Sequence, residues 1–306
     1  MRIKNNQFNK WLKKSDYEFV PMQVGETVVS LDPGVYRPDY SDALGSYYFH
    51  RKDFNTEDLI VLPSSKHQEI FRSIRRFLEC KELYKKNGFF FKRGILLHGR
   101  PGSGKTCLIN LICKHVIEHL GAVVITISNH PEVEMFTSEL SSVLRQIEPD
   151  RLIIIVFEDL DGLCQGSTET MVLNLLDGVN QLENVIYLGS TNYIENLKER
   201  VINRPSRFDD RIYVPFLSPE DREVYFRYKI PEDVIATIDL PEWVSKTDGM
   251  SFAHLAELIK SHLILGVSFD DTIKKLEEMN NFKGESSAKY EKKSGIGYNS
   301  GVKQNV

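Results

Sequence analysis

The amino-acid sequence predicts an α/β fold, in which a parallel sheet carries helices on both faces and a small all-helical subdomain follows. Three observations lead to this prediction. Short, almost continuously apolar runs alternate with helical patterns between residues 94 and 214. A glycine-rich loop lies between the first of these runs and the helix after it. Beyond residue 217, helical patterns follow one another with no strand between them. Apolar strands that alternate with helices are typical of a parallel sheet buried on both faces.

The individual elements follow from length and spacing. Apolar residues recur every three or four positions over 64–83, which predicts a helix before the sheet. Further helices are expected to begin at Lys105, Ser138 and Thr170. The expected strands cover residues 24–31, 94–98, 123–128, 152–157, 185–190 and 211–214. The expected helices of the C-terminal part cover residues 218–229, 231–238, 241–246, 251–265 and 270–279.

Length and composition fit a soluble globular protein of about two domains. We divide the 306 residues into a segment of unassigned role (1–50), an α/β nucleotide-binding domain (51–216), a helical subdomain (217–282) and a basic tail expected to be disordered (283–306). No apolar run approaches the ~18 residues of a membrane helix, so no membrane span is expected. The cysteines show no C-x-x-C pairing, which favours a reducing, cytoplasmic compartment.

The glycine-rich loop reads Gly-Arg-Pro-Gly-Ser-Gly-Lys-Thr over residues 99–106, a complete G-x-x-x-x-G-K-[ST] phosphate-binding loop. Glycines let successive backbone N–H groups face phosphate oxygens, while Lys105 can reach the β- and γ-phosphates and Thr106 can bind Mg²⁺. A glycine-rich turn that matches by chance is the alternative, and the order of strand, loop and helix argues against it. We therefore expect a nucleoside triphosphate here. The residues expected to hold it are Gly99, Pro101, Gly102, Ser103, Gly104, Lys105, Thr106 and Cys107.

Polar side chains follow two further strands at their carboxyl ends. Glu158 and Asp159 come directly after the run 152–157. Hydrolysis of Mg-ATP needs one carboxylate for the Mg²⁺ shell, and a neighbouring carboxylate can polarise the attacking water. Asn192 follows the run 185–190 and would lie beside the γ-phosphate, where its amide can orient that water. An acidic turn after a strand is common by itself, but its spacing after the phosphate loop favours the catalytic interpretation.

Two arginines, Arg204 and Arg207, lie beyond the strand 185–190 and just before the last one. From there they cannot easily reach the phosphates of their own subunit, but they are well placed to reach those of a neighbour. An arginine supplied in trans is worth on the order of 10³–10⁵ in rate. Surface ion pairs are the alternative for either arginine alone.

These motifs together resemble a classical AAA ATPase over roughly residues 50–280. The resemblance also includes residues 173–178 (Leu-Asn-Leu-Leu-Asp-Gly) and residues 248–255, which are similar to the Gly-x-Ser-x-Ala stretch of the lid in that family. It implies a RecA-like α/β domain, a helical lid that contributes Gly249 to the nucleotide site, and a ring that hydrolyses ATP between subunits.

Within that family, the chain is similar to the branch that contains the mitochondrial Rieske-protein translocase, without its membrane helix. The lead-in to the phosphate loop and the order Glu158-Asp159 carry this similarity. On that basis we assign the Mg²⁺ role to Glu158, with Thr106, and the water-polarising role to Asp159. Arg100 replaces the usual proline and Ser206 a glycine. The pore-loop triplet of many AAA unfoldases has only a poor counterpart in residues 135–137, where Phe136 is expected to pack internally.

The sequence therefore predicts a homo-oligomeric ring, a hexamer or heptamer, that uses ATP and Mg²⁺ to remodel or move a macromolecular client. A protein client is favoured over nucleic acid, because the formal net charge is −4 and no basic stripe with interleaved aromatics is found. Two alternatives stay open: a nucleic-acid motor or loader of the same fold, and a nucleotide-gated assembly module with low turnover. A small-molecule kinase leaves the arginine pair and the helical lid without a purpose.

Overall fold

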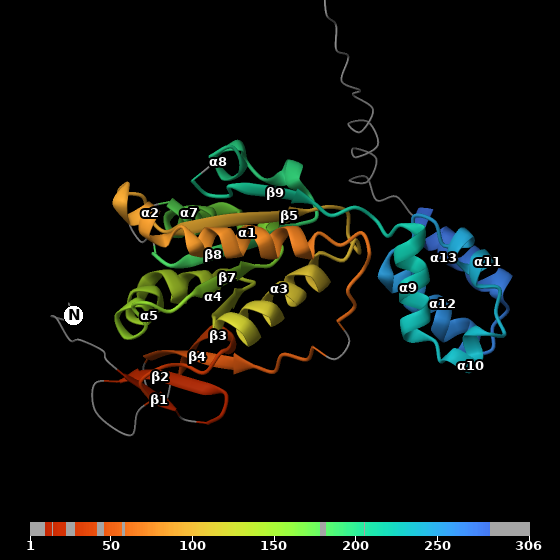
Figure 1. The fold of residues 1–306 in the computed structure, drawn as a ribbon, viewed down its shortest axis with the longest axis horizontal. Helices are drawn as coiled ribbons and strands as arrows, with labels where there is room; N and C mark the ends of the chain where they lie inside the picture. The colour runs from red at the N-terminus through yellow and green to blue at the C-terminus, as the bar shows by residue number, and fades with distance from the viewer. Residues whose placement is uncertain are drawn as a thin grey trace, which may run out of the picture. The chain divides into compact units, whose positions relative to one another are not determined.

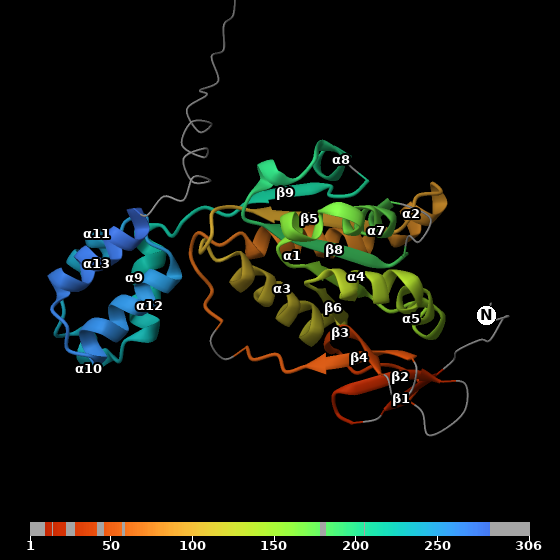
Figure 2. The ribbon, with the colours of Figure 1, turned by 180° about the vertical axis from the view of Figure 1, so that it is seen from behind.

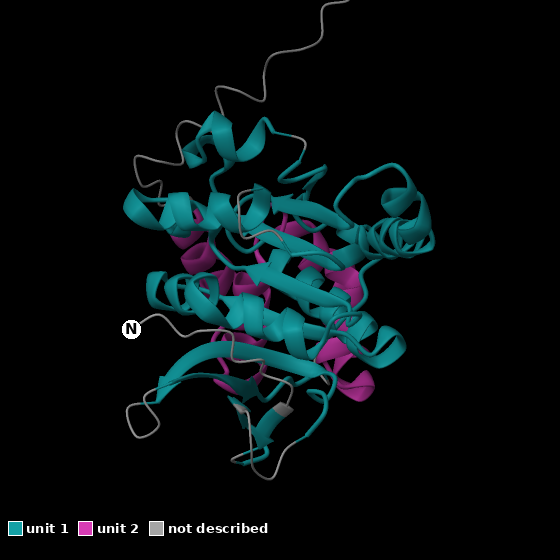
Figure 3. Cartoon of the chain, turned by 90° about the vertical axis from the view of Figure 1, so that its left-hand side faces the viewer, with its two compact units in different colours: residues 1–221 teal, residues 222–306 magenta. Residues whose placement is uncertain are grey.

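The computed structural model describes residues 10–13, 15–22, 28–41, 46–56, 59–177, 182–204 and 206–281 (Figure 1). The expected disordered tail, 283–306, lies outside these ranges. The chain divides into two compact units, residues 1–221 and residues 222–306, which Figure 3 colours separately. Each unit is described by itself.

The first unit is built on one nine-stranded mixed sheet, in the order β1-β2-β4-β3-β6-β7-β8-β5-β9. Its last six strands all pair in parallel. These are β3 (Gly34–Ser41), β6 (Val123–Ile127), β7 (Ile153–Phe157), β8 (Val185–Thr191), β5 (Lys92–His98) and β9 (Asp210–Tyr213). The predicted parallel sheet is thus confirmed for this part, where strands such as β6, β7 and β8 are buried at every position.

The sheet continues beyond β3 with antiparallel strands, which the sequence did not predict. These are β4 (Ser46–Lys52), β2 (Glu18–Met22) and β1 (Lys10–Lys13). The segment 1–50, to which the sequence assigned no role, thereby joins the same sheet through the parallel pairing of β3 with β6. The strand predicted over 24–31 is absent from its described part, where Val28 forms only an isolated bridge to Trp11. Residues 24–27 lie outside the described residues.

Helices cover both faces of the sheet, as predicted (Figures 1 and 2). Alternate residues of β7 enter two separate apolar cores, because successive side chains of a strand point to opposite faces. One core includes side chains of α1 (His67–Glu79) and α3 (Lys105–Leu120). The other contains side chains of α4 (His130–Met135), η1 (Phe136–Leu140), α5 (Ser141–Ile147), α6 (Leu160–Leu163) and α7 (Gly166–Asp177). Short helices α2 (Lys81–Lys86), η2 (Ile194–Asn196) and α8 (Glu199–Ile202) complete the unit.

Phe136 lies in the second core and has no exposed surface. The centroid of its ring lies 6.4 Å from that of Phe49 on β4. Trp11 and Phe19 of the outer strands belong to the same core. The expectation that Phe136 packs internally is therefore confirmed, and the triplet around it does not present an aromatic side chain to a pore.

The second unit contains helices only in its described part. They are α9 (Pro219–Lys229), within which the unit begins, α10 (Glu232–Ile235), α11 (Leu240–Lys246), α12 (Phe252–Ile259), η3 (Lys260–Ile264) and α13 (Phe269–Asn281). Trp243 packs between Phe226, His262 and Phe269, with ring centroids 5.3–5.7 Å away. Among the helices that the structure describes, none combines the length and the apolar character needed to cross a membrane.

Candidate active site

The polar residues singled out after three strands meet at one edge of the sheet. Strand β8 lies between β7 and β5, and all three run in parallel. His98 at the end of β5 pairs with Thr191, and Phe157 at the end of β7 pairs with Gly189. The phosphate loop, the carboxylates after β7 and the amide after β8 therefore emerge side by side. The carboxyl edge of a parallel sheet is where ligands bind in open α/β folds.

The phosphate loop adopts a conformation that depends on its glycines. Gly102 and Gly104 have φ angles of +77° and +92°, in the left-handed region that side chains disfavour. A Cβ atom on Gly99 would lie 2.3 Å from the backbone oxygen of Val214, so the loop packs directly on the segment after β9. The last two residues of the motif, Lys105 and Thr106, are the first two of α3, and that helix begins without a side-chain cap. An anion bound at this helix N-terminus can accept hydrogen bonds from the first backbone N–H groups of the helix.

Lys105 is nine-tenths buried within the loop that it closes. Its Nζ donates hydrogen bonds to the carbonyl oxygens of Gly99, at 2.8 Å, and Arg100, at 3.0 Å. Burial lowers the pKa of Lys105 to about 8, against the opposing charges of Asp159 and Asp161. Among the residues that the structure describes, none forms a hydrogen bond with the buried hydroxyl of Ser103. A buried cation and an unpaired hydroxyl in a loop of backbone N–H groups fit a bound polyphosphate.

Because the lowered pKa of Lys105 is close to neutral pH, ATP affinity should depend on pH. The charged ammonium is the form that attracts phosphate, and its population falls as pH rises through about 8. We expect ATP affinity to fall above this pH, approaching roughly tenfold per pH unit. Equilibrium titration with a fluorescent ATP analogue at constant ionic strength, on both sides of the transition, tests this. An affinity that stays level across the range would contradict the role of this charge.

The residues after β7 and β8 are held close together. Asp159 has a φ of +47°, and its Oδ1 accepts a hydrogen bond of 3.2 Å from Nδ2 of Asn192. Asp161, which the sequence analysis did not assign, accepts a bond of 2.6 Å from the hydroxyl of the buried Thr191. The side chain of Glu158 is half-buried. A carboxylate and the amide of Asn192 are therefore in contact at this edge of the sheet, and Asp161 adds a third carboxylate there.

The expected Mg²⁺ ligands are Thr106, which is exposed on the first turn of α3, and Glu158. In the part of the chain that the structure describes, no three His, Cys, Asp or Glu side chains are arranged to hold a metal. Mg²⁺ is usually held by one or two carboxylates together with substrate phosphates. Cys107, the last expected loop residue, directs its thiol to the carbonyl of Ile60 at 3.8 Å.

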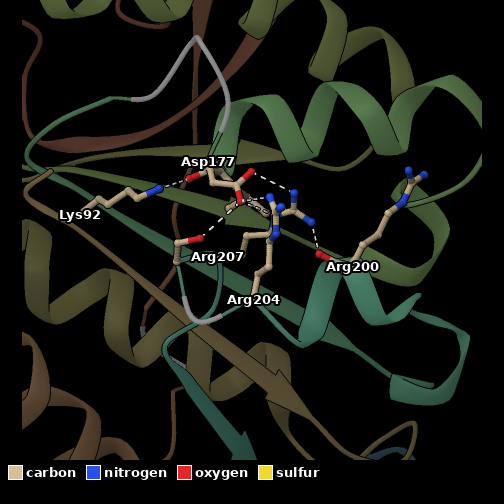
Figure 4. Close-up of polar contacts among 7 residues, drawn as sticks. Lys92, Asp177, Arg200, Arg204 and Arg207 are labelled. Carbon is tan, nitrogen blue, oxygen red and sulfur yellow. Dashed lines mark hydrogen bonds and ion pairs between the residues drawn. The ribbon is translucent and has the colours of Figure 1, made fainter. Parts of the chain in front are cut away.

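The two predicted arginines converge on one carboxylate, Asp177, at the end of α7 (Figure 4). Arg207 forms a two-point contact with it, Nε to Oδ2 at 2.8 Å and Nη2 to Oδ1 at 3.0 Å. Arg204 contacts the same Oδ2 through Nη1 at 3.2 Å. Burial acts to raise the pKa of Asp177, but the hydrogen bonds and charges of the two arginines hold it below its usual value. The side chain of Arg207 is only 7% exposed, whereas that of Arg204 is 64% exposed.

The arginine pair lies at the opposite end of the sheet from the phosphate loop. A Cβ atom on Gly94, near the start of β5, would come within 1.9 Å of the carbonyl oxygen of Arg207. The phosphate loop begins at Gly99, beyond the other end of that strand. Five residues of strand span roughly 16 Å at about 3.3 Å per residue. This separation exceeds the reach of an arginine side chain, so neither arginine can serve the phosphates of its own subunit.

A second ion cluster fixes the segment that carries the arginines. The buried carboxylate of Glu169, on the first turn of α7, accepts bonds of 2.5 Å from Lys198 and from Arg200. Nη1 of Arg207 donates to the carbonyl oxygen of Arg200. Both ends of α7 therefore hold the chain between β8 and β9. The sequence did not predict these partners, and the only signal for them is the Leu-Leu-Asp-Gly run that ends at residue 178.

The remaining predicted site residue, Gly249, belongs to the second unit. Its φ is +67°, and its carbonyl oxygen accepts a bond of 3.2 Å from Nδ2 of Asn280. Its contribution to the nucleotide site stays a prediction.

A phosphate loop at the carboxyl edge of a parallel sheet, with carboxylates and an amide after the neighbouring strands, defines a P-loop nucleoside-triphosphatase. Residues 95–216 match the model of the "ATPase family associated with various cellular activities (AAA)". Residues 95–216 therefore carry an AAA ATPase domain, as the resemblance implies, and ATP with Mg²⁺ are the ligands of this class of site.

The match extends to individual proteins. The chain is 33% identical over 184 residues to the human "ATPase family gene 2 protein homolog A", covering 55% of this chain and 20% of that one. It is 29% identical over 182 residues to the "probable mitochondrial chaperone bcs1" of Schizosaccharomyces pombe, covering 55% and 39%. It is 25% identical over 250 residues to the "proteasome-activating nucleotidase" of Methanopyrus kandleri, covering 74% and 56%. The chain thus spans between a fifth and a little over half of the length of these relatives.

Proposed function

We propose that this chain hydrolyses Mg-ATP at the interfaces between subunits of a homo-oligomeric ring, a hexamer or heptamer, and uses the cycle to remodel or move a protein. The observation that carries the proposal is the position of Arg204. It lies on the surface at one end of the sheet, while the phosphate loop of the same chain lies at the other. Because Arg204 cannot reach the phosphates of its own chain, we propose that it contacts those of a neighbouring subunit. A ring is a closed assembly in which every subunit has such a neighbour.

Each residue at the carboxyl edge of the sheet then has a distinct task. Lys105 and the loop N–H groups bind the β- and γ-phosphates, and Thr106 with Glu158 would hold Mg²⁺, which supplies charge neutralisation when bound. Asp159, with its carboxylate positioned by Asn192, accepts a proton from the attacking water. Arg204 of the adjacent subunit stabilises the charge that develops on the transferred phosphoryl group.

A protein client is supported by two kinds of observation. Two of the relatives are named a chaperone and a proteasome-activating nucleotidase. The chain itself carries a formal net charge of −4, which opposes nonspecific binding to nucleic acid. Because Phe136 is buried, the client is moved by a surface other than an aromatic pore triplet at residues 135–137. We also place the protein in a reducing, cytoplasmic compartment, since none of its four cysteines forms a disulfide.

The experiment that tests this proposal arrests hydrolysis without removing the nucleotide. Asp159→Asn should bind ATP with wild-type affinity but lower turnover by about 10²–10⁴-fold, because an amide is a poor proton acceptor. Binding is measured by equilibrium titration and turnover by phosphate release. Asp150→Asn is the matched control, because Asp150 is 92% exposed and precedes β7, at the strand end away from the phosphate loop.

Three outcomes separate the alternatives. If Glu158→Gln rather than Asp159→Asn gives bound but uncleaved ATP, the two carboxylates exchange roles. If wild-type protein assembles with ATP but shows no turnover, it is a nucleotide-gated assembly module. If turnover requires DNA or RNA and falls steeply with salt, it is a nucleic-acid motor.

A protein client should be retained by the arrested Asp159→Asn ring in a pull-down from native extract.

A further inference from the structure

Two consecutive phenylalanines are exposed just before β5. Phe89 and Phe90 are 68% and 51% exposed, and Leu83 of α2 is 57% exposed. The next residue, Phe91, is buried and stacks on Phe77 with ring centroids 4.1 Å apart. A run of three phenylalanines therefore contributes only its last member to the core. Large apolar side chains gathered on a surface indicate a site of interaction.

The backbone fixes this exposure. Gly88, with a φ of +71°, follows α2, and its N–H donates to the carbonyl of Lys85 at 3.2 Å. The N–H of Phe89 donates to the carbonyl of Tyr84 at 3.0 Å. These two bonds form a Schellman motif, in which the residue after the glycine often packs back onto the helix. Phe89 is two-thirds exposed instead, so a well-defined turn holds it outward.

The phenylalanines and the exposed arginine line one hollow of about 810 Å³, which we call the aromatic depression. The residues that define it here are Leu83, Phe89, Phe90, Asp177, Arg204 and Ser206. Ser206 bonds to Asp177 at 3.3 Å, so the polar part of the lining is tied to the arginine pair. An apolar wall and the proposed trans-acting arginine thus belong to the same surface.

The charges at the two ends of the sheet are complementary. Exposed Lys85 and Lys86 lie just before Phe89, and Arg204 adds a third cation at this end. The other end carries the exposed carboxylate of Asp159 and the half-buried Glu158, and in the proposed function it also holds ATP phosphates. A ring contact joins two different surfaces of the same chain, and surfaces of opposite charge favour that contact.

We infer that the aromatic depression is a docking surface for a second copy of this chain, with Phe89 and Phe90 as its apolar anchors. The inference rests on the proposed function, because the neighbour that receives Arg204 must approach the depression that Arg204 lines. Aromatic side chains at the centre of an interface commonly carry most of its affinity, and a rim of charges sets the orientation.

The first test is a double variant, Phe89→Ser with Phe90→Ser, examined by light scattering with ATP and Mg²⁺ present. Both side chains are exposed, so the variant should keep the wild-type melting temperature and ATP affinity. Its mass should fall from that of the assembly to that of one chain, 35.3 kDa. Val29→Ser is the matched control, because Val29 is 75% exposed outside the depression, and it should assemble normally.

The second test uses the wild-type protein and needs no substitution. Hydroxyl-radical footprinting should show Phe89 and Phe90 oxidised several-fold more slowly in the ATP-bound assembly than in the dilute monomer. An assembly that forms and hydrolyses ATP while these rings stay reactive, or while the double variant keeps its full mass, overturns the docking surface and leaves the proposed function standing. A chain that hydrolyses ATP as a verified monomer overturns both.

Discussion

Lys105→Ala should abolish ATP binding. The ammonium is buried within the loop, where its Nζ already bonds to the carbonyl oxygens of Gly99 and Arg100. With ATP bound, the same group can turn to the β- and γ-phosphates, and no methyl group can replace those charged hydrogen bonds. Two such bonds at about 1.5 kcal/mol each give a loss of at least about a hundredfold in affinity.

Thermal unfolding with and without ATP measures this effect and checks the fold together. A ligand present at about 100 times its dissociation constant stabilises the native state by about 2.7 kcal/mol, which raises the melting temperature of the wild type. The variant should melt normally and show no increase on addition of ATP. Lys114→Ala, on the same helix but outside the loop, should respond like the wild type. An undiminished response in Lys105→Ala would remove the loop from the site.

The sequence predicted the nucleotide edge of the sheet because its signals are local. Strands β6, β7 and β8 are continuous apolar runs, and the loop and the carboxylates follow them directly along the chain. Once these strands pair in parallel, their carboxyl ends lie at the same edge of the sheet.

The helix expected to begin at Ser138 begins instead at His130, because Asn129 caps it by accepting a hydrogen bond from the N–H of Glu132.

The sequence did not predict features that depend on contacts between distant residues. Strands β1, β2 and β4 are short and contain charged residues, and their buried side chains, Trp11, Phe19 and Phe49, share one core with side chains of α4 and η1. Arg204 and Arg207 bind Asp177, which is about thirty residues earlier in the chain. Nothing in the sequence around either arginine indicates this partner. The sequence also does not predict that Phe89 is exposed, because a run of three phenylalanines is typical of a buried segment.

The structure also changes which arginine gives the cleaner test of catalysis in trans. Arg207 is buried, and replacing it by alanine would leave the carboxylate of Asp177 with the exposed partners Arg204 and Ser206. Removing one member of a buried ion pair costs about 3–5 kcal/mol of stability, so a loss of turnover in that variant would not distinguish catalysis from misfolding. Arg204 contacts the same carboxylate from the surface, where substitution has little effect on stability.

Arg204→Ala should therefore bind ATP and keep the wild-type melting temperature, but lower turnover by about 10³–10⁵-fold, the range for an arginine supplied by a neighbour. Arg227→Ala is the matched control, because Arg227 is also an exposed arginine paired with a carboxylate, that of Glu223, and its loss should leave turnover unchanged. Turnover is measured by steady-state phosphate release at saturating ATP.

Mixing two inactive variants decides whether Arg204 acts between subunits. Arg204→Ala subunits keep an intact phosphate loop, and Lys105→Ala subunits keep an intact Arg204, so hydrolysis should recover where the second supplies its arginine to the first. In a random one-to-one mixture about a quarter of the contacts have this composition in a head-to-tail ring, so recovery should approach a quarter of the wild-type rate. Co-assembly is verified by differential labelling of the two variants. Co-assembled rings that stay inactive, with each interface firing independently in the wild type, would contradict action in trans, because the required pair of residues is then present and fails to work.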